Sequence, residues 1–154
     1  MSFILTILSA VIIFILSQFV LRLILEPIVE LKKCMGSICY NLLYFRSKLT
    51  NASSDNKISN EIKICSSKLI ATYSSIPFYK KIHKIFSLPS DRNLFEASRN
   101  LNLIRAYMIE GHKEYLASCK SIDFPSEISN SLDKVSELLN IPTSYQEKIQ
   151  NNKK

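Results

Sequence analysis

The sequence contains very little glycine and no tryptophan. Only 2 of its 154 residues are glycine, so it has almost no material for a Gly-rich phosphate-binding loop or for positive-φ hairpin turns. The many tight connections of a β-sandwich or β-barrel are disfavoured for the same reason. Apolar residues make up 47% of the chain and charged residues 21%, which excludes wholesale disorder. This composition predicts an all-α protein with one domain of ordinary size.

The sequence also lacks the residue spacings of metal sites. Cys34 and Cys39 are five positions apart, which places them about 140° apart around a helix. His83 and His112 lie on different segments, so neither cysteine nor histidine spacing supports zinc. We predict no metal and no cofactor. All four cysteines are interpreted as reduced structural residues: Cys34, Cys39, Cys65 and Cys119.

Common catalytic arrangements are missing as well. The sequence has no G-x-S-x-G motif and no cysteine with a recognisable basic partner. Glu26 and Glu30 share a helix face, but they stand close to lysines and are interpreted as surface ion-pairing residues. Glu110 and Glu114 have the same spacing and the same interpretation. We therefore predict that the chain is not an enzyme.

Charge is absent from the first part of the chain. Residues 3–20 contain no charged side chain, and the apolar character continues to Leu25. About 20 helical residues cross a hydrocarbon core of roughly 30 Å. A cleaved signal peptide is the main alternative, but it requires a basic start and a small-x-small cleavage site, whereas only Met1 and Ser2 precede the apolar run. Residues 1–25 are therefore predicted to be a retained transmembrane anchor.

The charges that flank this segment predict its orientation. No Lys or Arg precedes it, whereas Arg22, Lys32 and Lys33 follow closely. Because cationic flanks stay in the cytoplasm, we expect the N-terminus outside and residues 26–154 inside. Arg22 can extend to the headgroups from within the apolar stretch.

Small residues lie on one face of the predicted anchor: Thr6, Ser9, Ala10 and Ser17. Such residues allow close approach of helices and indicate possible self-association. Small residues are also common in any membrane helix, so both interpretations stay open.

Apolar residues recur at steps of three and four after Glu26-Pro27, the period of a packed helix. The proline predicts a kink or break at the membrane surface. We predict helices over about residues 27–50, 58–76 and 78–86, with a turn at 51–56. The expected core positions are Ile28, Leu31, Met35, Ile38, Leu42, Phe45 and Leu49 in the first helix, and Ile58, Ile62, Cys65, Leu69, Thr72 and Ile76 in the second.

Two further helices are predicted in the second half of the chain. Ser90 is placed to cap the first of them, which has a bend at Glu110-Gly111 and an apolar face that continues to Cys119. Asp123-Phe124-Pro125 opens the last helix. The expected core positions are Leu94, Ala97, Leu101, Ile104 and Met108, then Ile128, Leu132, Val135 and Leu139. We predict a cytoplasmic bundle of four or five helices over residues 26–141 and a flexible polar tail over 142–154.

The chain has 20 Lys and Arg against 13 Asp and Glu, a net charge of +7. The densest basic cluster is Lys80, Lys81, His83 and Lys84. It is compatible with a solvated face, with contact to anionic lipids at about 1 kcal/mol per Lys or Arg, and with contact to nucleic acid. The aromatic residues around it have helical spacing and are interpreted as core anchors: Phe78, Tyr79 and Phe86.

Several short segments resemble a group of small bacterial single-pass membrane proteins of no known activity. In that group an apolar N-terminal helix is followed by Glu-Pro-Ile. The matching segments are Glu26-Pro27-Ile28, Met35-Gly36, Ser66 through Ala71, Ile76-Pro77-Phe78-Tyr79, Leu88-Pro89-Ser90 and Glu96-Ala97-Ser98, all within residues 3–110. The resemblance implies a bacterial inner-membrane location and assigns no activity or cofactor.

We expect a membrane-anchored helical interaction or accessory protein that tethers a partner at the bilayer surface. Its expected contacts are lipids and a protein partner or second copy, rather than nucleic acid. The candidate contact residues are Arg22, Lys32, Lys33, Lys80, Lys81 and Lys84. The alternative is an effector that oligomerises through the anchor and perturbs the membrane.

Overall fold

The computed structural model describes residues 2–51, 55–117 and 123–145, with side chains at 3–51, 55–109 and 123–145. All its elements are helices. They are α1 (Ser2–Val20), the π-helical turn η1 (Leu21–Leu25), α2 (Glu26–Tyr44), α3 (Arg46–Thr50), α4 (Asn56–Ser74), α5 (Tyr79–Ile85), α6 (Asp91–Ala117) and α7 (Phe124–Leu139). The predicted all-α class, a long apolar N-terminal helix followed by a helical bundle, is confirmed.

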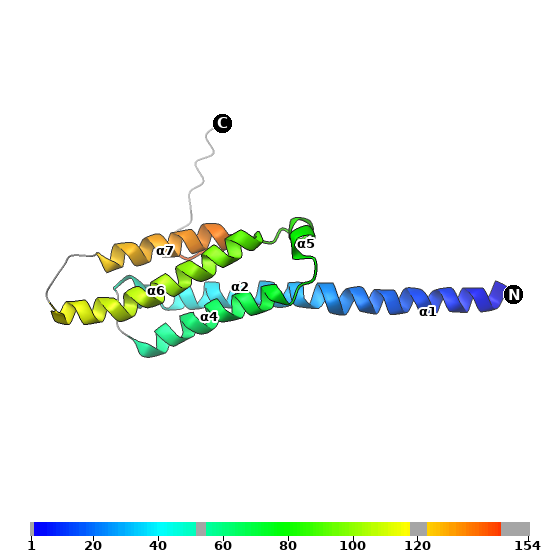
Figure 1. Cartoon of the computed structure of the whole chain (residues 1–154), viewed down its shortest axis with the longest axis horizontal. Helices are drawn as coiled ribbons and strands as arrows, with labels where there is room; N and C mark the ends of the chain where they lie inside the picture. The colour runs from blue at the N-terminus through cyan, green and yellow to red at the C-terminus, as the bar shows by residue number, and fades with distance from the viewer. Residues whose placement is uncertain (1, 52–54, 118–122, 146–154) are drawn as a thin grey trace, which may run out of the picture.

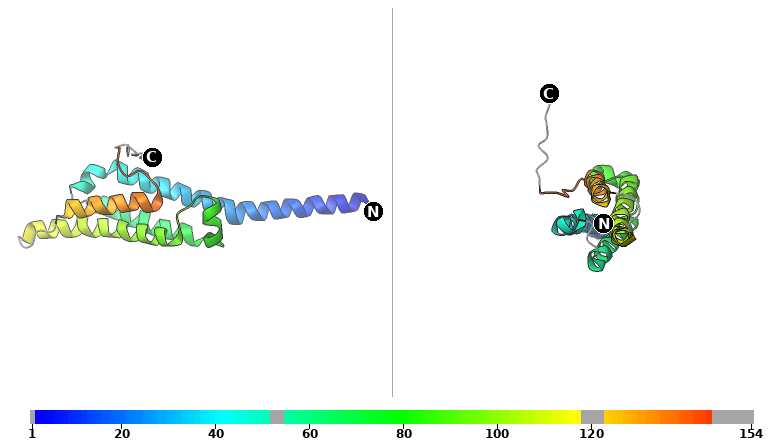
Figure 2. Two further views of the ribbon diagram at one scale, coloured as in Figure 1. Left: turned by 90° about the horizontal axis from the view of Figure 1, so that it is seen from above. Right: turned by 90° about the vertical axis from the view of Figure 1, so that its left-hand side faces the viewer.

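The molecule is an elongated bundle from which α1 projects alone (Figure 1). Helices α2, α4, α6 and α7 run alternately in opposite directions, and the view along the long axis shows them around a common centre (Figure 2). Helix α4 packs between α2 and α6, α7 packs on α6, and α3 contacts α7. One end of this bundle therefore joins α1, and the other end holds the start of α4, the end of α6 and the start of α7 (Figure 1).

The expected break at Pro27 is wrong, because the chain continues as a helix from α1 through η1 into α2. Proline lacks an amide hydrogen and its ring crowds the carbonyl four residues earlier. Here the preceding turn is π-helical, and the Glu26 amide donates to the Leu21 carbonyl five residues back. Pro27 then occupies the first turn of α2, where a missing amide is tolerated. The hydrogen-bond register changes while the helix remains continuous.

The predicted apolar stripes form the core. Every expected core position in α4 and α7 and, in α6, from Leu94 to Met108 is buried, as is Ile76 after α4. The side chains of residues 110–122 lie outside the described part of the chain. In the first stripe Met35 and Phe45 are only partly buried, and Cys34 is 2% exposed. Spacing alone therefore identifies almost the whole core.

A buried polar cluster fixes the packing of α4 against α6. The Ser66 hydroxyl lies 2.8 Å from the Ser98 hydroxyl and also accepts a hydrogen bond from the Asn102 amide at 2.9 Å. Ser66 and Ser98 are both buried. Since a buried polar group needs a partner, this cluster favours one register between the two helices.

Helix boundaries differ from the sequence prediction in two places. The helix expected over 27–50 is divided at Phe45, whose ψ of 7° separates α2 from α3. Helix α6 continues without interruption through Glu110-Gly111, so the expected bend does not break it. The predicted start of α7 is confirmed, because the Asp123 carboxylate accepts a hydrogen bond from the Ser126 amide.

The chain after α7 returns to the bundle. Thr143 is 3% exposed, and the Arg46 guanidinium donates to its carbonyl. The Cys39 thiol donates to the Pro142 carbonyl at 3.1 Å. The prediction of a flexible polar tail over 142–154 is therefore wrong at Thr143, which is buried against the bundle. The rest of the expected tail, residues 146–154, lies outside the described residues.

Candidate membrane-contact site

Helix α1 exposes nearly all of its apolar side chains. Phe3 is 76% exposed, Phe14 63% and Phe19 64%, and no other element covers the helix (Figure 1). A core helix of a soluble protein would be buried. By its length and composition, α1 could span a membrane.

The small-residue face of α1 uses its hydroxyls internally. The Ser9 hydroxyl donates to the Thr6 carbonyl and the Ser17 hydroxyl donates to the Ile13 carbonyl, both at 2.8 Å. Ala10 is exposed on the same helix. These serines can therefore remain in an apolar environment with their hydroxyls satisfied, whether or not a second helix packs on this face.

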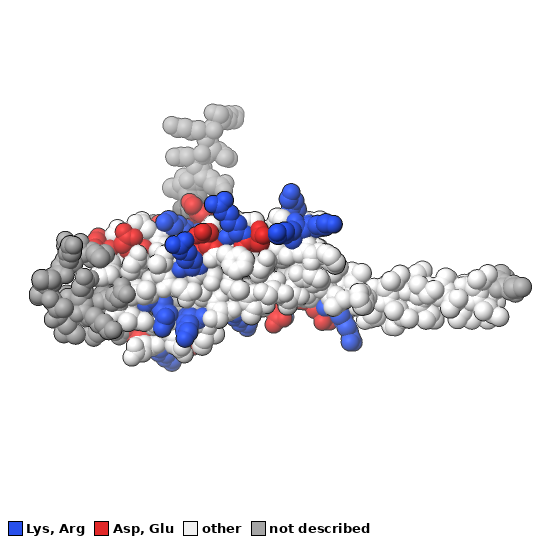
Figure 3. All heavy atoms as spheres, in the orientation of Figure 1, with Lys and Arg blue, Asp and Glu red and all other residues white. Residues whose placement is uncertain are grey.

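Charged residues begin where α1 ends. Arg22 in η1 is exposed, as are Lys32 and Lys33 on α2. Figure 3 shows Lys, Arg, Asp and Glu distributed over the bundle up to the end that joins α1, while the visible surface of α1 carries neither sign of charge. The change from an apolar to a charged surface thus coincides with the start of the bundle.

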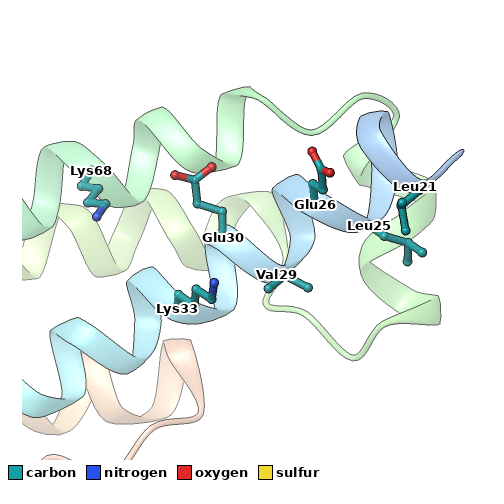
Figure 4. Close-up of a pocket in the computed structure, with 7 residues that line it drawn as sticks. All are labelled: Leu21, Leu25, Glu26, Val29, Glu30, Lys33 and Lys68. Atoms are coloured by element: carbon teal, nitrogen blue, oxygen red, sulfur yellow. The ribbon is translucent and has the colours of Figure 1, made fainter. Parts of the chain in front are cut away.

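An open hollow of about 480 Å³ lies beside this junction, between α2 and α4. In Figure 4, Glu30 and Lys33 project from α2, and Lys68 projects from α4 on the other side of the hollow. The ion pair found among the described residues is Lys48–Asp55, at 3.3 Å, so Glu30 is not paired with either lysine. The hollow is lined by Leu21, Leu25, Glu26, Val29, Glu30, Lys33 and Lys68. Its mixed charge assigns no particular ligand.

Helix α5 occupies the same end of the bundle and lies crosswise to α1 in both side views (Figures 1 and 2). Its inner side is attached by Tyr79 and Ile82, which are buried. The Tyr79 hydroxyl donates to the Pro89 carbonyl at 2.6 Å, and its ring meets the Tyr73 ring edge-on at 4.8 Å. Burial raises the pKa of Tyr79 above its ordinary value. These contacts hold α5 against the ends of α4 and α6.

The outer side of α5 combines exposed apolar and basic residues. Phe78 is 77% exposed and Ile85 is 76% exposed, and Lys80, Lys81 and Lys84 are exposed beside them. We call these five residues the α5 surface. The structure thus brings the three predicted lysines together with two apolar residues that were not assigned to a surface.

The prediction that Phe78 is a core anchor is wrong. Phe78 precedes α5 in the left-handed conformation, with φ of 54°, so its side chain does not follow the helical spacing on which the prediction rests. Tyr79 takes the buried position, as predicted, and Phe86 is partly buried. Pro77, which disfavours helical geometry before it, is the sequence signal that the periodicity changes here.

His83 is accounted for by contacts within α5. Its Nδ1 lies 3.2 Å from the Tyr79 carbonyl, and its ring stacks on the Tyr79 ring with centroids 5.8 Å apart. Among the described residues no group of three or more His, Cys, Asp and Glu could hold a metal ion.

The cysteines in the described part of the chain are free thiols: Cys34, Cys39 and Cys65. Burial raises the pKa of Cys65, against the lowering effect of its hydrogen bond from the Asn41 amide at 3.2 Å. A raised pKa makes a thiol less reactive at neutral pH. Cys119 lies outside the described residues.

Comparison of the chain with protein-family models, with curated proteins and with solved structures gives no match. The resemblance to small bacterial membrane proteins stays a prediction.

Proposed function

We propose that this chain is a single-pass membrane protein whose helical bundle tethers a partner protein at the bilayer surface. The observation that carries the proposal is the uninterrupted helix from α1 into α2, because it joins an exposed apolar segment directly to a packed bundle. A chain of this kind acts by raising the effective concentration of its partner at the membrane. The proposal includes no enzyme activity and no cofactor.

The proposed location is the bacterial inner membrane, with the N-terminus outside and the bundle in the cytoplasm. Arg22, Lys32 and Lys33 support this orientation, because cationic residues next to a span remain on the cytoplasmic side. The bacterial location rests on the sequence resemblance alone.

Two stacked tyrosines on α2 are the first surface to test for partner contact. Tyr40 and Tyr44 are 63% and 65% exposed, and their ring centroids are 5.7 Å apart. They lie toward the end of the bundle opposite α1, which leaves them accessible above a membrane (Figure 1). Tyrosine is enriched at protein interfaces because it presents a large, rigid contact area.

The test is affinity capture of the full-length protein in mild detergent, with the mass of the purified particle determined. The proposal expects a second protein at fixed stoichiometry that is lost in the Tyr40→Ala/Tyr44→Ala variant. Phe95→Ala is the control, since Phe95 is 52% exposed on α6. A monomer that retains no partner from its native cells contradicts the tethering proposal.

The alternative function, an oligomeric membrane-perturbing effector, is supported by the small-residue face of α1. It expects a homo-oligomer without a second protein, and loss of membrane potential on expression. Ser9→Leu would then abolish depolarisation by blocking close helix approach. The tethering proposal expects no depolarisation with or without this substitution.

A further inference from the structure

We propose that α5 is an interfacial membrane helix. In this arrangement Phe78 and Ile85 enter the boundary between headgroups and acyl chains, and Lys80, Lys81 and Lys84 contact anionic headgroups. The inference deepens the proposed function, because it requires α1 to span the bilayer and adds a second contact that holds the bundle against it.

The position of α5 relative to α1 is the first argument. The charge-free run of residues 3–20, 18 residues in helical geometry, covers roughly 27 Å, close to the thickness of a hydrocarbon core of about 30 Å. Arg22 and η1 then fall at the headgroup layer. Because α5 lies at the end of the bundle that joins α1 (Figures 1 and 2), the helix is placed at the level of the same layer.

The orientation of α5 is the second argument. The helix lies crosswise to α1, so it is parallel to the plane of a membrane that α1 crosses. Its buried residues, Tyr79 and Ile82, face the bundle. An interfacial helix has this arrangement, in which the axis lies in the membrane plane and an apolar and basic side faces the lipid.

The chemistry of the α5 surface is the third argument. Phe78 and Ile85 are each more than three-quarters exposed. Exposure of such large apolar side chains to water is unfavourable, and their transfer to the acyl boundary of a membrane is favourable. Residues 78–86 contain three lysines and no acid. The nearest acid along the chain is Asp91, whose carboxylate accepts a hydrogen bond from the Arg92 amide at 3.0 Å. The α5 surface therefore complements an anionic bilayer.

The backbone of Phe78 is the fourth argument. A residue other than glycine seldom adopts a positive φ, because its Cβ crowds the backbone. Phe78 has φ of 54° and remains exposed, so the core does not compensate for this conformation by burying the ring. A hollow of about 510 Å³ beside it is lined in part by Ile76, Lys80 and Lys81. A lipid contact would bury the ring that the fold leaves outside.

The chain contains no tryptophan, so a single introduced indole reports its own surroundings. We would place Phe78→Trp and, separately, Ile85→Trp in the full-length protein, reconstituted in phosphatidylethanolamine–phosphatidylglycerol vesicles. Quenching by lipids brominated along the acyl chain measures proximity to the acyl region. The control is Tyr44→Trp, another exposed aromatic position, at the opposite end of α2.

We expect strong quenching for both α5 variants and little for Tyr44→Trp. Lys80→Gln/Lys81→Gln/Lys84→Gln should reduce the ratio of bound to free α5 about a hundredfold at low salt, and quenching should fall accordingly. Lys57→Gln/Lys63→Gln/Lys134→Gln is the matched control, since all three lysines are exposed elsewhere. In vesicles of pure phosphatidylcholine, which carry no net charge, Phe78→Trp and Ile85→Trp should be quenched as weakly as when the three lysines are replaced by glutamine.

Resistance of the protein to alkaline extraction tests α1 separately. If the chain resists extraction but Phe78→Trp and Ile85→Trp are no more quenched than Tyr44→Trp, the inference about α5 is overturned and the proposed function stands. Quenching that is unaffected by the three lysine substitutions would also overturn it, because mere closeness to α1 would then explain the signal. The inference is also overturned if a partner protein or nucleic acid changes the fluorescence of the introduced tryptophan and lipid does not.

Discussion

Ser66 connects α4 to two polar side chains of α6 in the bundle. Its hydroxyl contacts Ser98 on α6 and accepts a hydrogen bond from Asn102. Ser66→Ala would leave the buried Ser98 hydroxyl without this partner, and we expect the free energy of unfolding to fall by about 1–3 kcal/mol. Urea denaturation of the full-length protein in detergent, followed by circular dichroism, measures this change.

Ser67→Ala is the matched control, because Ser67 is the next residue of α4 and is exposed. Its substitution should change the free energy of unfolding by no more than about 0.5 kcal/mol. Equal effects of the two substitutions would mean that the buried hydrogen bonds contribute nothing specific.

Single residues are also where sequence reasoning was most successful. Leu101, Ile104 and Met108 are fully buried in α6 as their spacing predicts, since helical periodicity directly selects one face. Helical spacing did not predict the exposure of Phe78, because a positive φ depends on how the chain connects two helices and leaves no periodic pattern in the sequence. The burial of Thr143 depends on distant contacts with α2 and α3, which local sequence does not specify.

At the scale of elements, the attachment of α5 depends on its Tyr79 hydrogen bond to Pro89. Burial raises the pKa of Tyr79 above its ordinary value of 10.0. Above about pH 10 the unfolded chain therefore loses the phenolic proton while the folded chain retains it, and folding stability falls as pH rises. Below that pH both states hold the proton and this contribution to pH dependence disappears.

We predict that Tyr79→Phe reduces this alkaline loss of stability, because phenylalanine has no proton to release. Melting temperatures of both proteins at about pH 9 and about pH 11 would show a larger decrease for the parent chain. At neutral pH, Tyr79→Phe should cost about 0.5–1.5 kcal/mol through the lost hydrogen bond. A parallel decrease for the two proteins would exclude Tyr79 as the source.

The ends of the helices were harder to predict from the sequence than which side of each helix is buried. The periodicity of residues 27–50 continues across Phe45, although the helix is interrupted there, because three- and four-residue steps survive a short turn. The reverse occurs at Pro27, where the sequence predicts a break but the helix continues through a π-helical turn. Neither outcome is encoded in hydrophobic spacing.

For the whole molecule, the proposed orientation makes a prediction about the position of the C-terminus. A fluorescent protein fused after residue 154 should fluoresce in bacterial cells, and an alkaline phosphatase fusion at the same place should be inactive, because the cationic flank keeps the bundle in the cytoplasm. Cell fluorescence and phosphatase assays measure the two outcomes.

Arg22→Gln/Lys32→Gln/Lys33→Gln removes the charges nearest the span and should lower the fluorescence and raise the phosphatase activity. Lys57→Gln/Lys63→Gln/Lys134→Gln removes the same number of charges farther from the span and should preserve the original pattern. An active phosphatase fusion on the parent chain would reverse the proposed orientation.

In the proposed single-pass arrangement, the continuous helix from α1 into α2 would transmit a tilt of the spanning segment to the whole bundle. A spanning helix tilts by about 20° on average, and the tilt responds to bilayer thickness. Over the 19 residues of α2, such a tilt carries the far end of the helix about 10 Å sideways. Lipid composition would thus change the position of Tyr40 and Tyr44 relative to the membrane surface. Binding of α5 to the same surface would restrict the directions in which α2 can tilt.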